Sequence, residues 1–231
     1  MTISFIFAIV KIDNLLLQTI LFVPKKEGKK REKSAKLRDN QNYPAYFVVK
    51  GDGVMYIWVG IDMDSQLQGI KEKTMEAEKE IGFSHSNFTL PLHVSLKISF
   101  LVEEGQFDAV VKEISAIYQS TKAFAVGVRS IDREETIAWI RMEECAALNQ
   151  LSLCLNTVLK EKFGIPLHEY DLDYKFHTTL FMDDDKDKVK EGYERVKDCP
   201  VPSTLLARRF VIGVSETGAL GTYRIYSVCE K

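Results

Sequence analysis

Apolar and polar residues alternate with two different periods along the chain from about residue 45 onward. Short segments place an apolar residue at every second position, which predicts strands, and longer segments repeat apolar residues every three or four positions, which predicts helices. The predicted strands are 55–62, 92–102, 123–131, 136–142, 174–182, 204–216 and 221–229. The predicted helices are 64–82, 106–119, 143–163 and 185–198, of which the third ends at Gly164 and Pro166.

The order of these elements occurs twice, which divides the chain into two lobes, 54–131 and 136–229. The first strand of each lobe has one apolar face, and its other face carries a tryptophan, Trp58 or Trp139, together with polar residues. The apolar faces should pack against the helices, and the other two faces should line a groove between the lobes. The pattern therefore predicts an α+β fold with two pseudo-symmetric lobes around a central groove.

A four-residue pattern, His-x-Ser/Thr-apolar, occurs once in each lobe, as HVSL at 93–96 and as HTTL at 177–180. Alternation along a strand places the first and third residues of each motif on the same face. Two imidazoles and two hydroxyls that meet in one groove would form a site for general acid–base chemistry on a phosphate. The alternative is a pair of unrelated, solvent-facing strand histidines. The candidate catalytic residues are His93, Ser95, His177 and Thr179.

Several aromatic and basic residues on or beside the strands of the groove could hold a substrate. The four aromatic rings among them could stack on a base. The two lysines share the strand parity of the histidines and could reach a phosphate oxygen. For each residue the alternative is ordinary packing or a solvated side chain at the rim of the groove. The candidate substrate-binding residues are Tyr56, Trp58, Lys97, Trp139, Arg141, Tyr174 and Lys175.

The charge of the chain is unevenly distributed. The formal net charge of the 231 residues is −2, but residues 25–38 hold eight basic and two acidic side chains, which leaves −8 for the rest. An acidic folded part argues against a surface for extended duplex nucleic acid and is compatible with a small nucleotide or an RNA end. The four cysteines show no metal-ligand spacing and are typical of reduced thiols, so we expect a cytoplasmic protein with no metal site. We also expect a monomer.

The first 42 residues form an apolar segment followed by a basic one, and we predict that this extension is separate from a single bilobal domain at 43–231. Segment 3–23 is apolar, but Lys11 and Asp13 interrupt it, and each would cost roughly 3 kcal/mol near the centre of a membrane helix. A membrane anchor, a signal peptide, a β-hairpin and an extension outside the native fold all stay open. We favour a cytoplasmic protein over one anchored by this segment.

The two motifs, at 93–96 and 177–180, resemble those of the two-histidine (2H) phosphoesterase superfamily, and in particular its 2′,5′ RNA ligase-like or cyclic phosphodiesterase-like branch. The resemblance extends over about residues 54–229. It implies a pseudo-twofold α+β domain with one motif in each lobe and an antiparallel-rich sheet with flanking helices. Residues 1–42 have no counterpart in the resemblance.

The resemblance also implies a reaction. It implies metal-independent chemistry, without a cofactor, on 2′,3′-cyclic phosphates or 2′,5′ linkages of RNA ends or small nucleotides. One imidazole, of His93 or His177, would take a proton from water, and the other would give one to the leaving ribose oxygen. Ser95 and Thr179 would donate hydrogen bonds to the non-bridging oxygens. A nucleotide-binding or RNA-end-binding module with little turnover, and 2′,5′ RNA ligase activity, are the alternatives.

Overall fold

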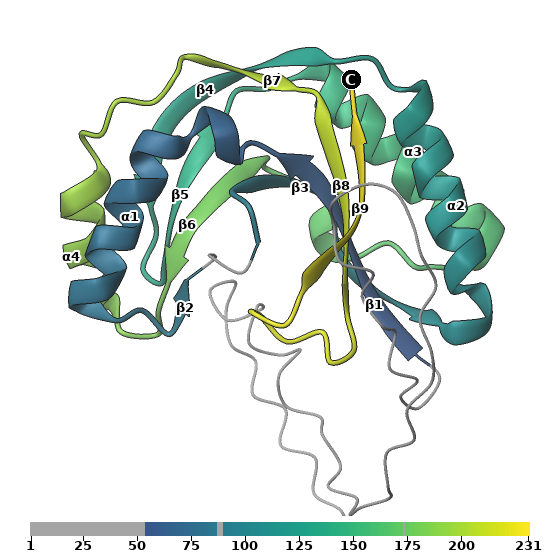
Figure 1. Cartoon of the computed structure of the whole chain (residues 1–231), viewed down its shortest axis with the longest axis horizontal. Coiled ribbons are helices and arrows are strands. Elements are labelled where there is room, and N and C mark those ends of the chain that lie inside the picture. The colour runs from purple at the N-terminus through teal and green to yellow at the C-terminus, as the bar shows by residue number, and fades with distance from the viewer. Residues whose placement is uncertain (1–53, 87–89, 173) are drawn as a thin grey trace, which may run out of the picture. The chain divides into compact units, whose positions relative to one another are not determined.

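The computed structural model of the chain describes residues 54–86, 90–172 and 174–231 (Figure 1). Residues 54–231 form one compact unit. The predicted extension at 1–42, with its apolar segment 3–23, lies outside the described residues. None of the helices within the described ranges has the length and apolar character that crossing a membrane requires.

The described strands form two antiparallel sheets, as the resemblance implied. The first sheet has the order β3-β1-β8-β9. Its strands are β1 (Val54–Asp62), β3 (His93–Glu103), β8 (Arg209–Ser215) and β9 (Arg224–Glu230). The second sheet has the order β2-β6-β5-β4-β7. Its strands are β2 (His85–Ser86), β4 (Phe124–Arg133), β5 (Ile137–Met142), β6 (His177–Met182) and β7 (Thr204–Ala207).

Two pairs of helices cover the sheets (Figure 1). Helices α1 (Gln68–Ile81) and α4 (Lys186–Val196) contact each other and the second sheet, whereas α2 (Glu104–Ser120) and α3 (Ala146–Phe163) contact each other and the first sheet. Short 3-10 turns at Asp64–Gln66 and Glu169–Asp171 precede α1 and β6. Helix α3 ends as predicted, because Gly164 adopts a left-handed conformation with φ of 69° that residues with a Cβ rarely adopt.

One strand of each predicted lobe belongs to the sheet of the other lobe, so the two sheets do not follow the predicted lobe boundaries at 54–131 and 136–229. Strand β4, which was expected to close the first lobe, pairs with β5 in the second sheet. Strand β8, which was expected in the second lobe, pairs with β1 in the first. The two related three-strand units are therefore β3-β1-β8 and β6-β5-β4. Hydrophobic alternation fixes which face of a strand is buried, but it does not fix which strand is its neighbour.

The faces of the central strands agree with the prediction. The side chains of alternate residues on β1 and β5 belong to the main hydrophobic core under the helices: Met55, Ile57, Val59, Ile61, Ala138, Ile140 and Met142. The intervening residues face away from that core. They include Trp58 on β1 and Trp139 and Arg141 on β5, so both strands present their aromatic and polar residues on the side of the two histidine motifs.

Candidate active site

The two histidine motifs lie on strands that contact each other across the two sheets. Strand β3 begins with His93, strand β6 begins with His177, and residues of the two strands are in contact (Figure 1). In agreement with this contact, the charge of His177 contributes to lowering the pKa of His93, after the larger effect of burial. The fold therefore brings together two motifs that are 84 residues apart in the sequence.

Each imidazole is held by the same backbone contact. The Nδ1 atom of His93 lies 2.7 Å from the carbonyl oxygen of Pro91, and the Nδ1 atom of His177 lies 2.7 Å from the carbonyl oxygen of Lys175. A carbonyl oxygen only accepts hydrogen bonds, so Nδ1 carries the proton in both rings. In both residues Nε2 is therefore the nitrogen that can take up or release a proton.

Burial lowers the pKa of both imidazoles. His93 is 9% exposed, and this burial lowers its pKa to about 4, against the opposing effect of the hydrogen bond to Pro91. Burial also lowers the pKa of His177, and the positive charge of Arg141 adds to that effect. Arg141 is close enough to have this effect because it is the direct partner of His177 across β5 and β6. A negatively charged ligand would offset these shifts and favour a charged imidazole.

The motif hydroxyls differ in their surroundings. The indole Nε1 of Trp58 donates a 2.9 Å hydrogen bond to the Oγ of Ser95. Burial raises the pKa of the nearby Tyr174 hydroxyl to about 12, and its interaction with Ser95 acts in the opposite direction. Within the described ranges, no hydrogen bond of the Thr179 side chain is found. The orientation of Ser95 is thus fixed by Trp58, and no described residue does the same for Thr179.

The sequence model of the 2′-5′ RNA ligase superfamily matches residues 71–219, which include both motifs. The chain belongs to the 2′-5′ RNA ligase superfamily. This match confirms the family resemblance of the two motifs. A search of curated proteins finds no match to the chain.

Solved structures of the E. coli protein LigT have the same fold. The LigT complex with 3′-AMP is 14% identical with a TM-score of 0.50, and the alignment covers 77% of this chain and 98% of LigT. The LigT complex with NADP+ is 17% identical with a TM-score of 0.50, and the alignment covers 78% of this chain and 98% of LigT. At these identities the likeness concerns the fold alone.

The four aromatic residues that were predicted to stack on a base differ in how deeply the structure buries them. Trp58 is 6% exposed and packs in a second hydrophobic cluster, so it has no open face for a base, and its predicted stacking role is wrong. Tyr56 is half-buried against the same cluster. Trp139 and Tyr174 are half-buried beside His177, with ring centroids 4.8 and 5.8 Å from the imidazole.

Lys97 points away from the groove, so its predicted role in binding phosphate is also wrong. Relative to β1, strand β3 has one extra residue between Ser95 and Lys97 and another between Lys97 and Phe100. These bulges reverse the alternation at Lys97. Lys97 is the direct partner of Val59, and directly paired residues project from the same face of a sheet, so its side chain lies on the core side.

On the core side, Lys97 forms a buried ion pair. Its Nζ lies 2.6 Å from the carboxylate of Asp171 and donates a 2.8 Å hydrogen bond to Asn156, and only 2% of the lysine side chain is exposed. The second predicted lysine, Lys175, is exposed just before β6. It contributes its backbone carbonyl to His177, a role that sequence parity does not reveal.

Arg141, a predicted substrate-binding residue, lies beside the second motif, and its guanidinium is 3.3 Å from the carboxylate of Asp132 on β4.

Asp64 was not among the predicted site residues. It accepts a 2.9 Å hydrogen bond from the backbone nitrogen of Leu92 and so fixes the residue before His93. Its only sequence signal is a carboxylate after the end of the first strand. Among the described residues, no group of three His, Cys, Asp or Glu side chains could hold a metal ion.

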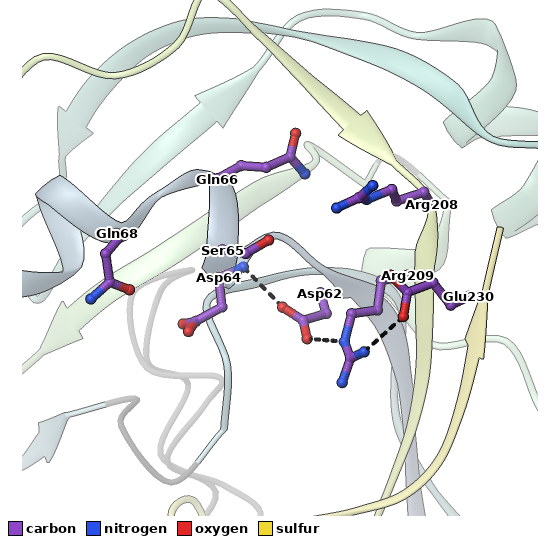
Figure 2. A pocket seen from close by; sticks show the side chains of 8 residues that line it. All are labelled: Asp62, Asp64, Ser65, Gln66, Gln68, Arg208, Arg209 and Glu230. Atoms are coloured by element: carbon purple, nitrogen blue, oxygen red, sulfur yellow. Dashed lines mark hydrogen bonds and ion pairs between the residues drawn. The ribbon is translucent and has the colours of Figure 1, made fainter.

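A pocket of about 460 Å³ lies at the end of β1 (Figure 2). It is next to the first motif because Asp62, one of its lining residues, is the direct partner of His93 across β1 and β3. The charges in the pocket largely neutralise one another. The Nε atom of Arg209 lies 2.7 Å from Asp62, and its guanidinium also reaches Glu230 at 3.2 Å, as the dashed lines in Figure 2 show.

Proposed function

We propose that the protein is a metal-independent phosphodiesterase that acts on 2′,3′-cyclic phosphates or 2′,5′-linked ends of RNA or of small nucleotides. The observation that carries the proposal is the matched pair of imidazoles. In both, a 2.7 Å contact between Nδ1 and a backbone carbonyl leaves Nε2 to exchange the proton. Two such groups supply one general base and one general acid, which is what hydrolysis of a phosphodiester requires.

In the proposed reaction, one imidazole Nε2 accepts a proton from water as the water oxygen attacks phosphorus. The phosphorus–oxygen bond to a ribose hydroxyl breaks, and the second imidazole, charged at that stage, gives its Nε2 proton to the leaving oxygen. The two imidazoles exchange protonation states over one turnover, so a proton must return through solvent. The negative phosphoryl group raises the pKa of the neighbouring imidazole and so favours the charged form that the general acid requires.

The two motif hydroxyls would hold the phosphoryl group. Ser95 accepts the hydrogen bond of Trp58, and its own hydrogen can be donated to a non-bridging oxygen. The hydroxyl of Thr179 occupies the third position of the second motif and has no competing hydrogen-bond partner among the described residues. Hydroxyl donors at these two positions would stabilise the charge that develops on the phosphoryl oxygens.

The proposed ligand class is a small nucleotide or an RNA end. The LigT structures similar in fold were solved with 3′-AMP and with NADP+, which are ligands of that class. The half-buried rings of Trp139 and Tyr174 beside His177 offer aromatic surface for a base or ribose. Excess negative charge outside residues 25–38 disfavours extended duplexes.

The test is turnover of 2′,3′-cyclic nucleotides and 2′,5′-linked dinucleotides in the presence of EDTA, with His93→Ala and His177→Ala as controls for contaminating nucleases. We expect the wild type to hydrolyse at least one of these substrates. Each variant should retain a native melting curve while losing at least roughly a hundredfold in rate. Turnover that EDTA abolishes and a divalent ion restores would contradict the mechanism. Binding of 3′-AMP without any turnover would favour a binding module.

A further inference from the structure

The indole of Trp58 lies over two glycines on neighbouring strands. A Cβ atom on Gly60, two residues further along β1, would lie 2.5 Å from the indole Cζ2. A Cβ atom on Gly213, the direct partner of Trp58 on β8, would lie 2.6 Å from the indole Cε3. Both distances are far shorter than carbon atoms tolerate without a shift. The position of the indole therefore depends on the absence of side chains at these two sites.

In this position Trp58 contacts both functional residues of the first motif. Its Nε1 donates a 2.9 Å hydrogen bond to the Oγ of Ser95. Its ring meets the imidazole of His93 edge-on, with centroids 4.2 Å apart and planes inclined at 61°. The indole also packs in one hydrophobic cluster with Leu90, Val211 and Tyr223 and is only 6% exposed, which leaves little surface for a substrate.

The hydrogen bond fixes the orientation of the Ser95 hydroxyl. An indole N–H can only donate, so the Ser95 oxygen must accept, and its own hydrogen is directed to another acceptor. A phosphoryl oxygen is such an acceptor. The indole thus prepares Ser95 to act as a donor before the substrate arrives.

The second motif lacks this arrangement. Trp139 is the direct partner of Thr179, whereas the direct partner of Ser95 is Gly60, so the two tryptophans are offset along their strands. The Nε1 atom of Trp139 is buried and has no hydrogen-bond partner among the described residues. Trp139 packs beside His177 at a centroid distance of 4.8 Å but does not orient the hydroxyl of its motif.

We propose that Trp58 is a positioning residue of the active site, which orients Ser95 for hydrogen bonding to the phosphoryl group and holds the ring of His93. This inference rests on the proposed function. Because Trp58 is shielded from the groove, it acts through Ser95 and His93 and not by touching the substrate.

The test is a double-mutant cycle between Trp58 and Ser95, measured as turnover of the 2′,3′-cyclic nucleotide that the wild type hydrolyses. Trp58→Phe keeps an aromatic ring but removes the N–H, and we expect it to lower kcat roughly tenfold with little change in KM. In the Ser95→Ala background the same substitution should have almost no effect, since its acceptor is gone. Trp139→Phe is the matched control, because its effect on kcat should be the same in both backgrounds.

Losses from Trp58→Phe and Ser95→Ala that multiply would overturn the inference. Should Trp58→Phe fail to fold, Gly213→Ala provides the second route, since it retains the N–H but displaces the indole. It should lower kcat in both backgrounds, and by a larger factor when Ser95 is present, because in Ser95→Ala only the contact with His93 remains to be lost. The two proposals fail differently. Unchanged turnover in His93→Ala or His177→Ala defeats the proposed function, whereas inactive histidine variants combined with independent Trp58 and Ser95 effects defeat only this inference.

Discussion

The two histidine motifs have the same backbone arrangement but different side-chain surroundings. In both, an imidazole Nδ1 lies 2.7 Å from the carbonyl oxygen two residues earlier. Around His93 the site is closed, with a buried tryptophan hydrogen-bonded to the motif serine. Around His177 it is more open, with Trp139 and Tyr174 half-buried beside the imidazole and no such bond to the motif threonine among the described residues.

This difference separates the features that the proposed reaction needs in both halves from those that it does not. The contact that sets the tautomer is present in both halves, as the proposed reaction requires, because both imidazoles would exchange protons at Nε2. The contacts that orient the hydroxyl differ, so one hydroxyl is oriented in advance and no described residue orients the other. The proposed reaction therefore makes the two halves equivalent in proton transfer and unequal in how they would hold the phosphoryl group.

The largest difference between the halves should be one of stability and concerns their lysines. Lys97→Met removes one partner of a buried ion pair and leaves the carboxylate of Asp171 uncompensated, which should lower the free energy of unfolding by roughly 3–5 kcal/mol. Lys175→Met is the matched control, and because Lys175 is exposed, it should change stability by less than about 0.5 kcal/mol. Urea denaturation measures both. Similar small losses in both variants would contradict the buried position of Lys97.

The next largest effect concerns the pH dependence of kcat/KM, which tests the lowered imidazole pKa that the two halves share. The base must be neutral and the acid charged, and the pKa values of both His93 and His177 lie below the ordinary value of about 6.5 in the free protein. Because the acid loses its proton as the pH rises through a lowered pKa, the descending limb lies below 6.5. We expect kcat/KM at pH 8.5 to be at least roughly tenfold below its maximum. A bell-shaped profile centred above pH 7 would show that the free protein does not hold both imidazoles neutral.

The smallest effect should distinguish the two hydroxyls. Ser95→Ala removes an oriented donor and also leaves the indole N–H of Trp58 without its acceptor, so we expect roughly a tenfold loss in kcat. Thr179→Ala should cost only severalfold, since the hydroxyl of Thr179 has no hydrogen-bond partner in the part of the chain that the structure describes. Steady-state kinetics at saturating substrate compares the two. Equal losses would mean that the orientation of Ser95 makes no difference to the rate.

Strand alternation predicted the features of the site that depend only on local geometry. It placed Ser95 with His93 and Thr179 with His177, and it separated the core face of β1 from the face that carries Trp58. These predictions succeed because a strand without irregularities repeats every two residues. The helices were predicted from a local repeat as well, because the apolar residues of a helix recur every three or four positions along one side. In α3 these are Leu148, Leu151, Leu155 and Leu159, all of which are buried.

The predictions that failed depend on non-local structure. Two bulges reverse the direction of Lys97, and their presence follows from pairing with β1 and not from the sequence of β3. Trp58 is covered by Leu90 and Tyr223, which lie far from it in the chain. The sheets to which β4 and β8 belong were also mispredicted, because they depend on which strands pair with each other. The contact of each imidazole with the preceding backbone is local, but it involves no side-chain pattern that could be read in advance.

The most direct test of the central claim, that the two imidazoles act as one unit, is the single-turnover rate of His93→Ala, His177→Ala and the double variant on the same 2′,3′-cyclic nucleotide. Each single variant should lose at least roughly a hundredfold, because general base and general acid are both needed in one step. The double variant should be little slower than the worse single variant, since groups that act together are not additive. A double variant whose loss equals the product of the two single losses, or a single variant with near-wild-type rate, would contradict the account.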